Sequence, residues 1–134
     1  MDYEVLAATD NWLMRTFSRS EFQKRMGTRE LHYLLGKFAD EIEQERGTVG
    51  KSFIAEAYRY EVPIYTSSPG DSTLGLDIAA LNLVGKDIQI DPSIDVNETA
   101  ALVLEAKQVG KSGVVVWGGG SPKNFILQPE PALQ

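Results

Sequence analysis

The 134-residue sequence contains no cysteine and a single histidine. The lack of cysteine excludes disulfides and thiolate metal sites, and one imidazole leaves little scope for zinc binding. A chain without cysteine is also compatible with an intracellular location. We therefore expect no metal site and no disulfide framework.

Positive charge is scarce as well. Thirteen Lys and Arg residues against nineteen Asp and Glu residues give a formal net charge of −6. This balance predicts no general binding to nucleic acid, because phosphate backbones are held mainly by basic side chains. No apolar run approaches the length of a membrane span, and the start of the chain lacks a basic export signal. We expect no membrane partner and a cytoplasmic location.

Residues 1–61 have the pattern of a helical segment. An apolar stretch at residues 3–17 predicts the first helix. Ser18, followed three residues later by Glu21, is a capping-box pattern, and it predicts a short second helix that ends at Gly27.

The third predicted helix has the clearest pattern. After Thr28, a good N-cap, apolar residues recur at helical spacing as far as Ile42. His32 lies in this helix, where a lone histidine is usually structural or at the surface. Residues 47–52 lack the first glycine and the preceding strand of a phosphate-binding P-loop, so they predict a helix end followed by a helix over residues 52–60.

From residue 62 onward, strand and helix patterns alternate. Three short apolar runs are predicted strands, at residues 62–66, 87–90 and 114–117. Two helical stretches separate them, at residues 73–84 and 95–108, and Asp95 with Glu98 forms a capping box for the second. Residues 62–134 therefore predict a βαβαβ arrangement, an α/β fold with a Rossmann-like parallel sheet and flanking helices in one domain with residues 1–61.

The last predicted strand ends in three glycines, Gly118, Gly119 and Gly120, which we call the glycine loop. The run before it has no polar alternation, so it should be a parallel strand covered on both faces. Without Cβ atoms the loop can bring backbone N–H groups close to a ligand. Ser121 and Pro122 are suited to begin a helix whose N-terminus attracts anions. A tight turn without a ligand fits three glycines alone equally well.

A second loop is expected at the same edge, because parallel sheets bind ligands beyond the carboxyl ends of their strands. This serine loop, residues 67–72, follows the first predicted strand. Its Asp71 could accept hydrogen bonds from a ribose hydroxyl or could be a turn or N-cap residue. Asp77 could face a cationic ligand, although exposure to solvent is the more ordinary expectation.

Two motifs read together resemble the deoxyhypusine synthase family, in its bacterial deoxyhypusine-synthase-like branch. They are PIYTSSPGDSTLG at residues 63–75 and GGGSPKN at residues 118–124. ELHYLLGK at residues 30–37 resembles the segment that precedes them in that family. The resemblance covers nearly the whole chain, as the central segment of a larger deoxyhypusine-synthase-type domain.

The resemblance implies an NAD-dependent transferase that moves the aminobutyl group of spermidine to an amine acceptor through an enzyme-lysine Schiff base. In deoxyhypusine synthase proper, the acceptor is a lysine of a translation factor precursor. The resemblance also implies a cytoplasmic homotetramer. Matched by motif, it implies two sets of site residues: NAD contacts at Asp71, Gly118, Gly119 and Gly120, and polyamine contacts at Asp77, Lys123 and Asn124.

The chain departs from the family pattern at two of these positions. Members that act on the translation factor have a histidine directly after the lysine of the triple-glycine motif, where this chain has Asn124, which cannot carry charge. They also have an aspartate directly after the Leu-Gly pair, where this chain has Leu76 and only then Asp77. One residue turns a helical side chain by about 100°, so Asp77 need not reach the same ligand.

The nucleophilic lysine of the family lies in a Ser-Trp-Gly-Lys stretch beyond the position of Gln134. We therefore expect no catalytic residue in this chain, and an inactive protein unless complementary segments of the same enzyme are present. Two alternatives remain open. One is homospermidine-synthase-like transfer to a free diamine, and the other is a non-catalytic nucleotide-binding module that lacks the lysine.

Overall fold

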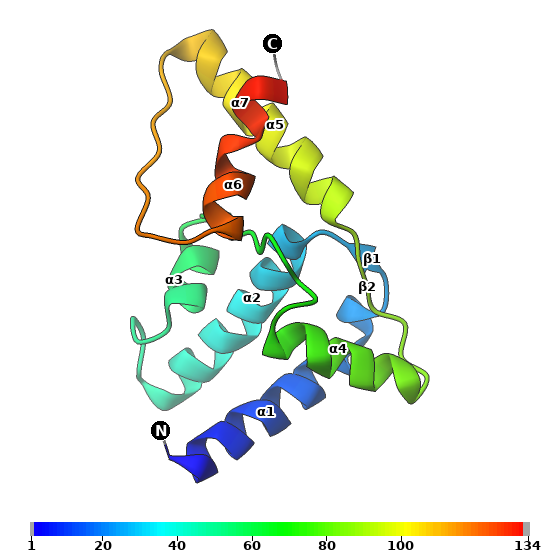
Figure 1. Ribbon diagram of the computed structural model, residues 1–134. Coiled ribbons are helices and arrows are strands. Elements are labelled where there is room, and N and C mark those ends of the chain that lie inside the picture. The colour runs from blue at the N-terminus through cyan, green and yellow to red at the C-terminus, as the bar shows by residue number, and fades with distance from the viewer. Residues whose placement is uncertain (1, 133–134) are drawn as a thin grey trace.

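The computed structural model describes residues 2–132, and most of them are helical (Figure 1). The helices are α1 (Tyr3–Phe17), α2 (Thr28–Arg46), α3 (Phe53–Arg59), α4 (Thr73–Leu83), α5 (Pro92–Val109), α6 (Ser121–Leu127) and α7 (Pro129–Ala132). A 3-10 turn, η1 (Ser20–Phe22), and two short strands, β1 (Arg25–Met26) and β2 (Gln89–Ile90), complete the fold.

Three of the helices predicted in the first half are confirmed, those at residues 3–17, from Thr28 onward and at residues 52–60. Helix α2 begins after Gly27 and ends at Gly47, whose φ of 63° lies in the left-handed region that glycine adopts without strain. Helices α3 and α4 begin at Ser52 and Ser72, whose hydroxyls accept hydrogen bonds from backbone N–H groups of the first turn. Local capping chemistry therefore sets these boundaries.

The sheet is small and parallel, with Arg25 opposite Gln89 and Met26 opposite Ile90. Strand β2 confirms the strand predicted at residues 87–90 for Gln89 and Ile90 only. Strand β1 corrects the helix predicted from Ser18, because the Ser18 hydroxyl donates to the Met14 carbonyl at the end of α1 instead of capping a new helix. After η1, the backbone is free to pair with β2.

The strands predicted at residues 62–66 and 114–117 are wrong, since both stretches are irregular. A β-strand needs a hydrogen-bonded neighbour, and the part of the chain that the structure describes places no strand beside either stretch. The coarse α/β class holds, with a two-strand parallel sheet, but a Rossmann-like sheet is not confirmed.

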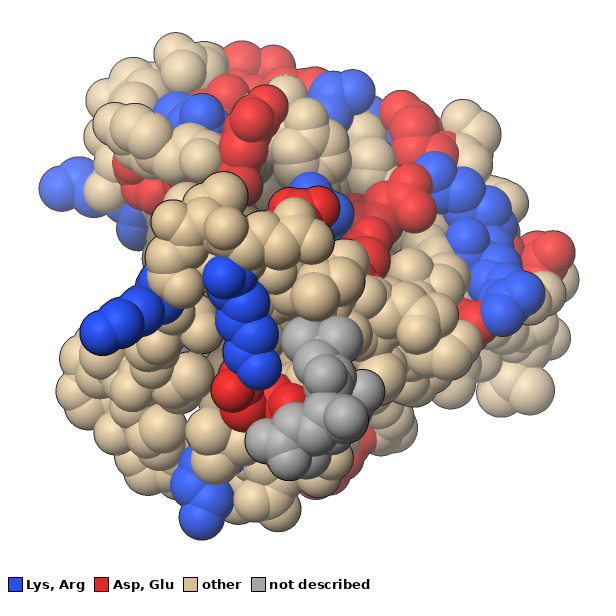
Figure 2. Space-filling model, turned by 90° about the horizontal axis from the view of Figure 1, so that it is seen from above, with Lys and Arg blue, Asp and Glu red and all other residues tan. Residues whose placement is uncertain are grey.

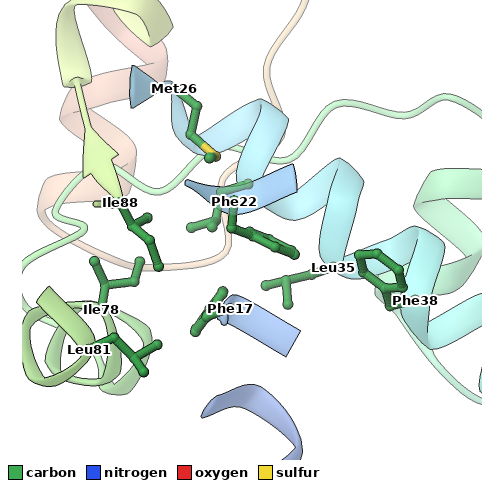
Figure 3. Close-up of a cluster of buried hydrophobic side chains, with 9 residues drawn as sticks. Phe17, Phe22, Met26, Leu35, Phe38, Ile78, Leu81 and Ile88 are labelled. Carbon is green, nitrogen blue, oxygen red and sulfur yellow. The ribbon is translucent and has the colours of Figure 1, made fainter. Parts of the chain in front are cut away.

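One hydrophobic core joins both halves of the chain. Its buried side chains come from α1, η1, β1, α2, α4 and the residue before β2: Phe17, Phe22, Met26, Leu31, Leu35, Phe38, Ile78, Leu81 and Ile88 (Figure 3). The rings of Phe17 and Phe22 meet edge to face, with centroids 5.4 Å apart. The helical first half and the βα second half therefore share a single core.

The C-terminal helices fold back on α5. Helix α7 packs along α5 (Figure 1), and Lys107 of α5 forms a 2.8 Å ion pair with Glu130 of α7. Between α5 and α6, residues 111–120 are all exposed. This irregular segment leads the chain from the end of α5 to Ser121, which contacts the serine loop, residues 67–72.

Candidate functional site

The serine loop (residues 67–72) is attached to the core by Thr66. The Thr66 N–H donates to the Thr28 hydroxyl oxygen over 2.9 Å. The Thr28 hydroxyl in turn donates to the Asp95 carboxylate over 2.7 Å. These bonds connect the start of the loop to the first turns of α2 and α5.

Asp95 is the centre of this arrangement and is only 1% exposed. Its carboxylate also accepts from the N–H groups of Thr28, over 2.9 Å, and Arg29, over 3.3 Å. A carboxylate here satisfies donors that α2 leaves unpaired and complements the helix dipole. The capping box predicted for Asp95 and Glu98 is wrong, because α5 begins earlier and Asp91 is its N-cap.

Close packing requires glycine beside this carboxylate. A Cβ atom at Gly27 would lie 2.4 Å from the Asp95 Oδ1 atom. Sequence reasoning took Gly27 as a helix end and Thr28 as an N-cap, so it did not find the contact of both with Asp95. The partners are 67 residues apart, and no local pattern could have indicated their contact.

His32 is the second group that lies against the serine loop. Its Nδ1 atom is 2.6 Å from the Thr28 carbonyl oxygen, so Nδ1 carries the proton and donates. Nε2 then faces the Thr66 hydroxyl at 3.4 Å as an acceptor in the neutral ring. His32 therefore has a structural role beside the loop, as the sequence predicted.

A cavity of about 260 Å³ lies behind the serine loop. Leu31, Leu74, Ile78 and Ile90 give it apolar walls, and His32 and Thr66 add polar atoms. A Cβ atom at Gly75 would lie 2.2 Å from the Pro69 carbonyl oxygen, so the loop folds tightly over the start of α4. The serine loop is therefore held at its start by the Thr66 hydrogen bond to Thr28, and by the close approach of Pro69 to Gly75 of α4.

The glycine loop meets the serine loop as the sequence predicted, although the strand before it is not formed. Ser121 donates to the Ser67 hydroxyl over 2.8 Å and lies 3.0 Å from the Ser68 hydroxyl. The Tyr65 and Phe125 rings approach with centroids 6.1 Å apart. Contacts between α6 and the serine loop therefore bring the two loops together.

The backbone of the glycine loop needs glycine. Gly118 and Gly119 have φ values of 68° and 90°, which other residues rarely adopt. Gly120 is the N-cap of α6 and Ser121 is its first helical residue, so the cap lies one position earlier than the one predicted at Ser121. Among residues 2–132, chain neighbours aside, only the Pro122 ring lies within 4 Å of a Cβ built at any of the three glycines. The backbone is thus open to a ligand.

The other predicted site residues divide into two groups. Asp71, Lys123 and Asn124 are exposed on or beside the two loops. Asp77 lies elsewhere, on the side of α4 that faces α1, and is 8% exposed. The expectation that Asp77 faces solvent is therefore wrong, because its side chain is buried.

The carboxyl of Asp77 is in an unusual environment. Burial, with a further contribution from the nearby Asp10 carboxylate, raises its pKa. Its Oδ2 atom is buried and has no hydrogen-bond partner among residues 2–132. A neutral carboxyl group suits this position better than a charged one.

A polar cluster missed by sequence reasoning flanks the serine loop on the α5 side. The Tyr65 hydroxyl donates to the Glu98 carboxylate over 3.3 Å, and Arg29 lies 3.5 Å from the same carboxylate. Burial raises the pKa of Tyr65 to about 12, with the Glu98 charge as the next cause. Tyr65 is therefore a neutral hydrogen-bond donor at physiological pH.

Residues 2–132 include no group of three or more His, Asp and Glu side chains placed to hold a metal ion. Within the same residues, no helix is both long and apolar enough to cross a membrane. On the face shown in Figure 2, acidic and basic side chains are interspersed between uncharged areas.

Comparison with known proteins gives a consistent result. The deoxyhypusine synthase family model matches residues 1–133. A deoxyhypusine synthase-like protein of Nostoc punctiforme is 54% identical over 132 residues, which are 98% of this chain and 34% of that protein. One from Thermosynechococcus vestitus is 49% identical, with the same shares covered, 98% and 34%. A probable deoxyhypusine synthase 2 of Methanosarcina mazei is 35% identical over 96% of this chain and 36% of that protein.

The chain thus spans about a third of the length of the curated relatives it matches. No solved structure matches it.

Proposed function

The chain belongs to the deoxyhypusine synthase family, and from this premise we propose that it is the cofactor-contacting part of an NAD-dependent aminobutyl transferase. The substrate would be spermidine, and the acceptor a lysine of a translation factor precursor. The observation that carries the proposal is the contact of Ser121 with Ser67 and Ser68, which joins the family's two motifs.

The residues at this junction fit NAD. The open backbone of Gly118 and Gly119 can lie against the cofactor, and its positive φ values explain why larger residues are unsuited there. The exposed carboxylate of Asp71 can accept hydrogen bonds from ribose hydroxyls. NAD, when bound, would supply the hydride acceptor for oxidation of the polyamine.

The polyamine would lie near α6. Asn124 and Lys123 are exposed in the first turn of that helix, and Asn124 can hydrogen-bond an amine without carrying charge. We do not assign the polyamine to Asp77 in the arrangement described, because α1 covers its carboxyl group. Complementary segments of a family enzyme, in a homo-oligomer, would supply the nucleophilic lysine and complete the site in the cytoplasm.

The test uses the chain grafted in place of the matched third of the Nostoc punctiforme relative, so that all segments are present. NAD-dependent release of a diamine from spermidine is expected. Asp71→Ala should weaken NAD binding by about 10- to 100-fold, the worth of hydrogen bonds to a charged group. Asp87→Ala, which removes another exposed carboxylate, is the matched control. Full NAD affinity in Asp71→Ala would refute the assignment.

One observation favours a second candidate, transfer to a free diamine as in homospermidine synthases. Asn124 replaces the histidine that family members acting on the translation factor have, and it is exposed. Offering putrescine and the translation factor precursor to the same grafted protein separates the two. Labelled aminobutyl groups in homospermidine alone would support the diamine acceptor, and labelled precursor would support the protein acceptor.

A further inference from the structure

Tyr65 lies two residues before the serine loop, and no step of the proposed function uses it. Its hydroxyl donates to the Glu98 Oε2 atom of α5 over 3.3 Å. Because burial raises the pKa of Tyr65 to about 12, this hydroxyl keeps its proton at physiological pH. Tyr65 is therefore a permanent hydrogen-bond donor to α5 beside the candidate site.

Arg29 fixes the other side of the Glu98 carboxylate. The Arg29 Nη1 atom is 3.5 Å from the Glu98 Oε1 atom, so each oxygen of the carboxylate has its own partner. The backbone N–H of Arg29 also donates to the Asp95 carboxylate over 3.3 Å. Arg29 therefore joins Glu98 to the buried carboxylate that anchors the serine loop.

The ring of Tyr65 faces α6. Its centroid is 6.1 Å from that of Phe125, and the two ring planes are tilted by 42°. Helix α6 contains no buried residue, so few contacts hold it in place. A cavity of about 320 Å³ lies between residues 65–67 on one side and Pro122, Phe125 and Ile126 on the other. Because the packing here is open, α6 depends on the Tyr65 ring more than a closely packed helix would.

The glycine loop runs directly into α6, since Gly120 is the N-cap of that helix. A shift of α6 therefore moves the backbone of the glycine loop. We propose that Tyr65 is a positioning residue for the cofactor site: Glu98 holds its hydroxyl, and its ring sets where α6 places the glycine loop relative to the serine loop. The identity of the ligand as NAD rests on the proposed function, whereas the positioning of α6 does not.

Disulfide closure tests the positioning in the chain itself, which has no cysteine of its own. The Ser121 and Ser67 hydroxyl oxygens are 2.8 Å apart, so Ser67→Cys with Ser121→Cys places two thiols within reach of a disulfide. Under a fixed mild oxidant, Tyr65→Phe should slow closure about fivefold, because it removes the bond to Glu98 and keeps the ring. Tyr60→Phe, at an exposed ring, is the matched control and should leave closure unchanged.

Two changes at Glu98 separate the hydrogen bond from a general loosening of the fold. Glu98→Ala should slow closure as much as Tyr65→Phe, and the two together should slow it no further, because they remove the same bond. Glu98→Gln keeps an acceptor oxygen and should close at nearly the parent rate. Additive losses, or parent-rate closure in Tyr65→Phe, would overturn the proposal. Failure of the parent pair to close would also overturn it, since α6 would then not rest on the serine loop.

NAD titration tests the effect on the site, in a grafted protein whose other two thirds carry no free cysteine. With the engineered thiols reduced, Tyr65→Phe should weaken NAD binding about fivefold. Closing the disulfide should remove this difference, because the disulfide then holds α6 in place of the tyrosine hydroxyl. A difference that persists after closure would indicate direct contact of the hydroxyl with NAD and would overturn the positioning role.

The positioning role and the cofactor assignment fail in different ways. Slowed closure in Tyr65→Phe, with no NAD binding by the grafted protein, would support the positioning of α6 and refute the cofactor assignment. NAD binding of equal strength in Tyr65→Phe and its parent would refute the positioning role and leave the cofactor assignment intact.

Discussion

The two loops that meet at Ser121 are held in very different ways. The serine loop follows Thr66, whose backbone donates to Thr28, and Thr28 is bonded to the buried Asp95. The seven residues before the glycine loop, 111–117, and Gly118 and Gly119 within it are all exposed, and none of them makes a backbone–backbone hydrogen bond among the described residues. Contacts of α6 bring the glycine loop to the serine loop: Ser121 donates to Ser67, and Phe125 packs against Tyr65 just before the serine loop.

The difference between the two loops indicates that the serine loop is the preorganised half of the candidate site. Buried hydrogen bonds fix the serine loop within the core of this chain, and such bonds are costly to break. The glycine loop has an open backbone, and among residues 2–132 it is joined to the serine loop by the contact of Ser121 with Ser67.

The largest expected effect comes from the buried carboxylate. Asp95→Ala leaves the N–H groups of Thr28 and Arg29 and the Thr28 hydroxyl without their acceptor, and should lower the free energy of unfolding by about 3 kcal/mol. Glu105→Ala, an exposed change on the same helix, should stay within about 0.5 kcal/mol. Urea unfolding followed by circular dichroism measures both. Equal midpoints would contradict the contrast between the loops.

The same substitution in the two regions tests the contrast next. Thr66→Pro removes the N–H that donates to Thr28 and should cost about 2 kcal/mol. Val115→Pro in the isolated chain removes an N–H that has no partner among residues 2–132, and should change stability by less than about 0.5 kcal/mol. A similar loss in both variants, measured by thermal unfolding, would show that residues 111–119 are structured after all.

The third prediction concerns the buried carboxyl group of Asp77 in α4, whose Oδ2 atom has no hydrogen-bond partner among residues 2–132. The raised pKa of Asp77 means that the folded protein favours the protonated carboxyl group. The stability that protonation contributes is present below the pKa of the unfolded state, and it is lost as pH rises through the pKa of the folded state. Asp77→Asn should therefore be nearly neutral near pH 4 and stabilising by about 1 kcal/mol at pH 7. Unfolding free energies across this range check it. Parallel pH profiles for the two proteins would contradict the prediction.

The smallest effect is expected at the junction itself. Ser121→Ala removes exposed hydroxyl contacts to Ser67 and Ser68, so stability should stay within about 0.5 kcal/mol. In the grafted protein, NAD binding should weaken roughly threefold, because one neutral hydrogen bond is worth about 1 kcal/mol or less. Ser20→Ala is the control. A large loss of stability in Ser121→Ala would mean that the junction, like the serine loop, belongs to the core.

Most of the helices could be predicted from the sequence because their signals are local. Apolar residues indicated α2, α3 and α4, and the turn-forming residues placed the two loops. The strand at residues 114–117 was wrong for this chain because apolar, β-branched composition reports a preference, whereas a strand also requires a neighbour. The same limit applies to residues 62–66.

The sequence by itself determined most of the helices, the loop motifs and the family. Only the tertiary structure decided which distant groups meet: Asp95 with Thr28, Ser121 with Ser67, and Asp77 with Asp10. The physical reason is that helical propensity and capping act over a few residues, while hydrogen bonds to buried carboxylates depend on how helices pack. Asp95 shows this most clearly, because its spacing to Glu98 indicated a cap for its own helix, yet its carboxylate stabilises the start of α2.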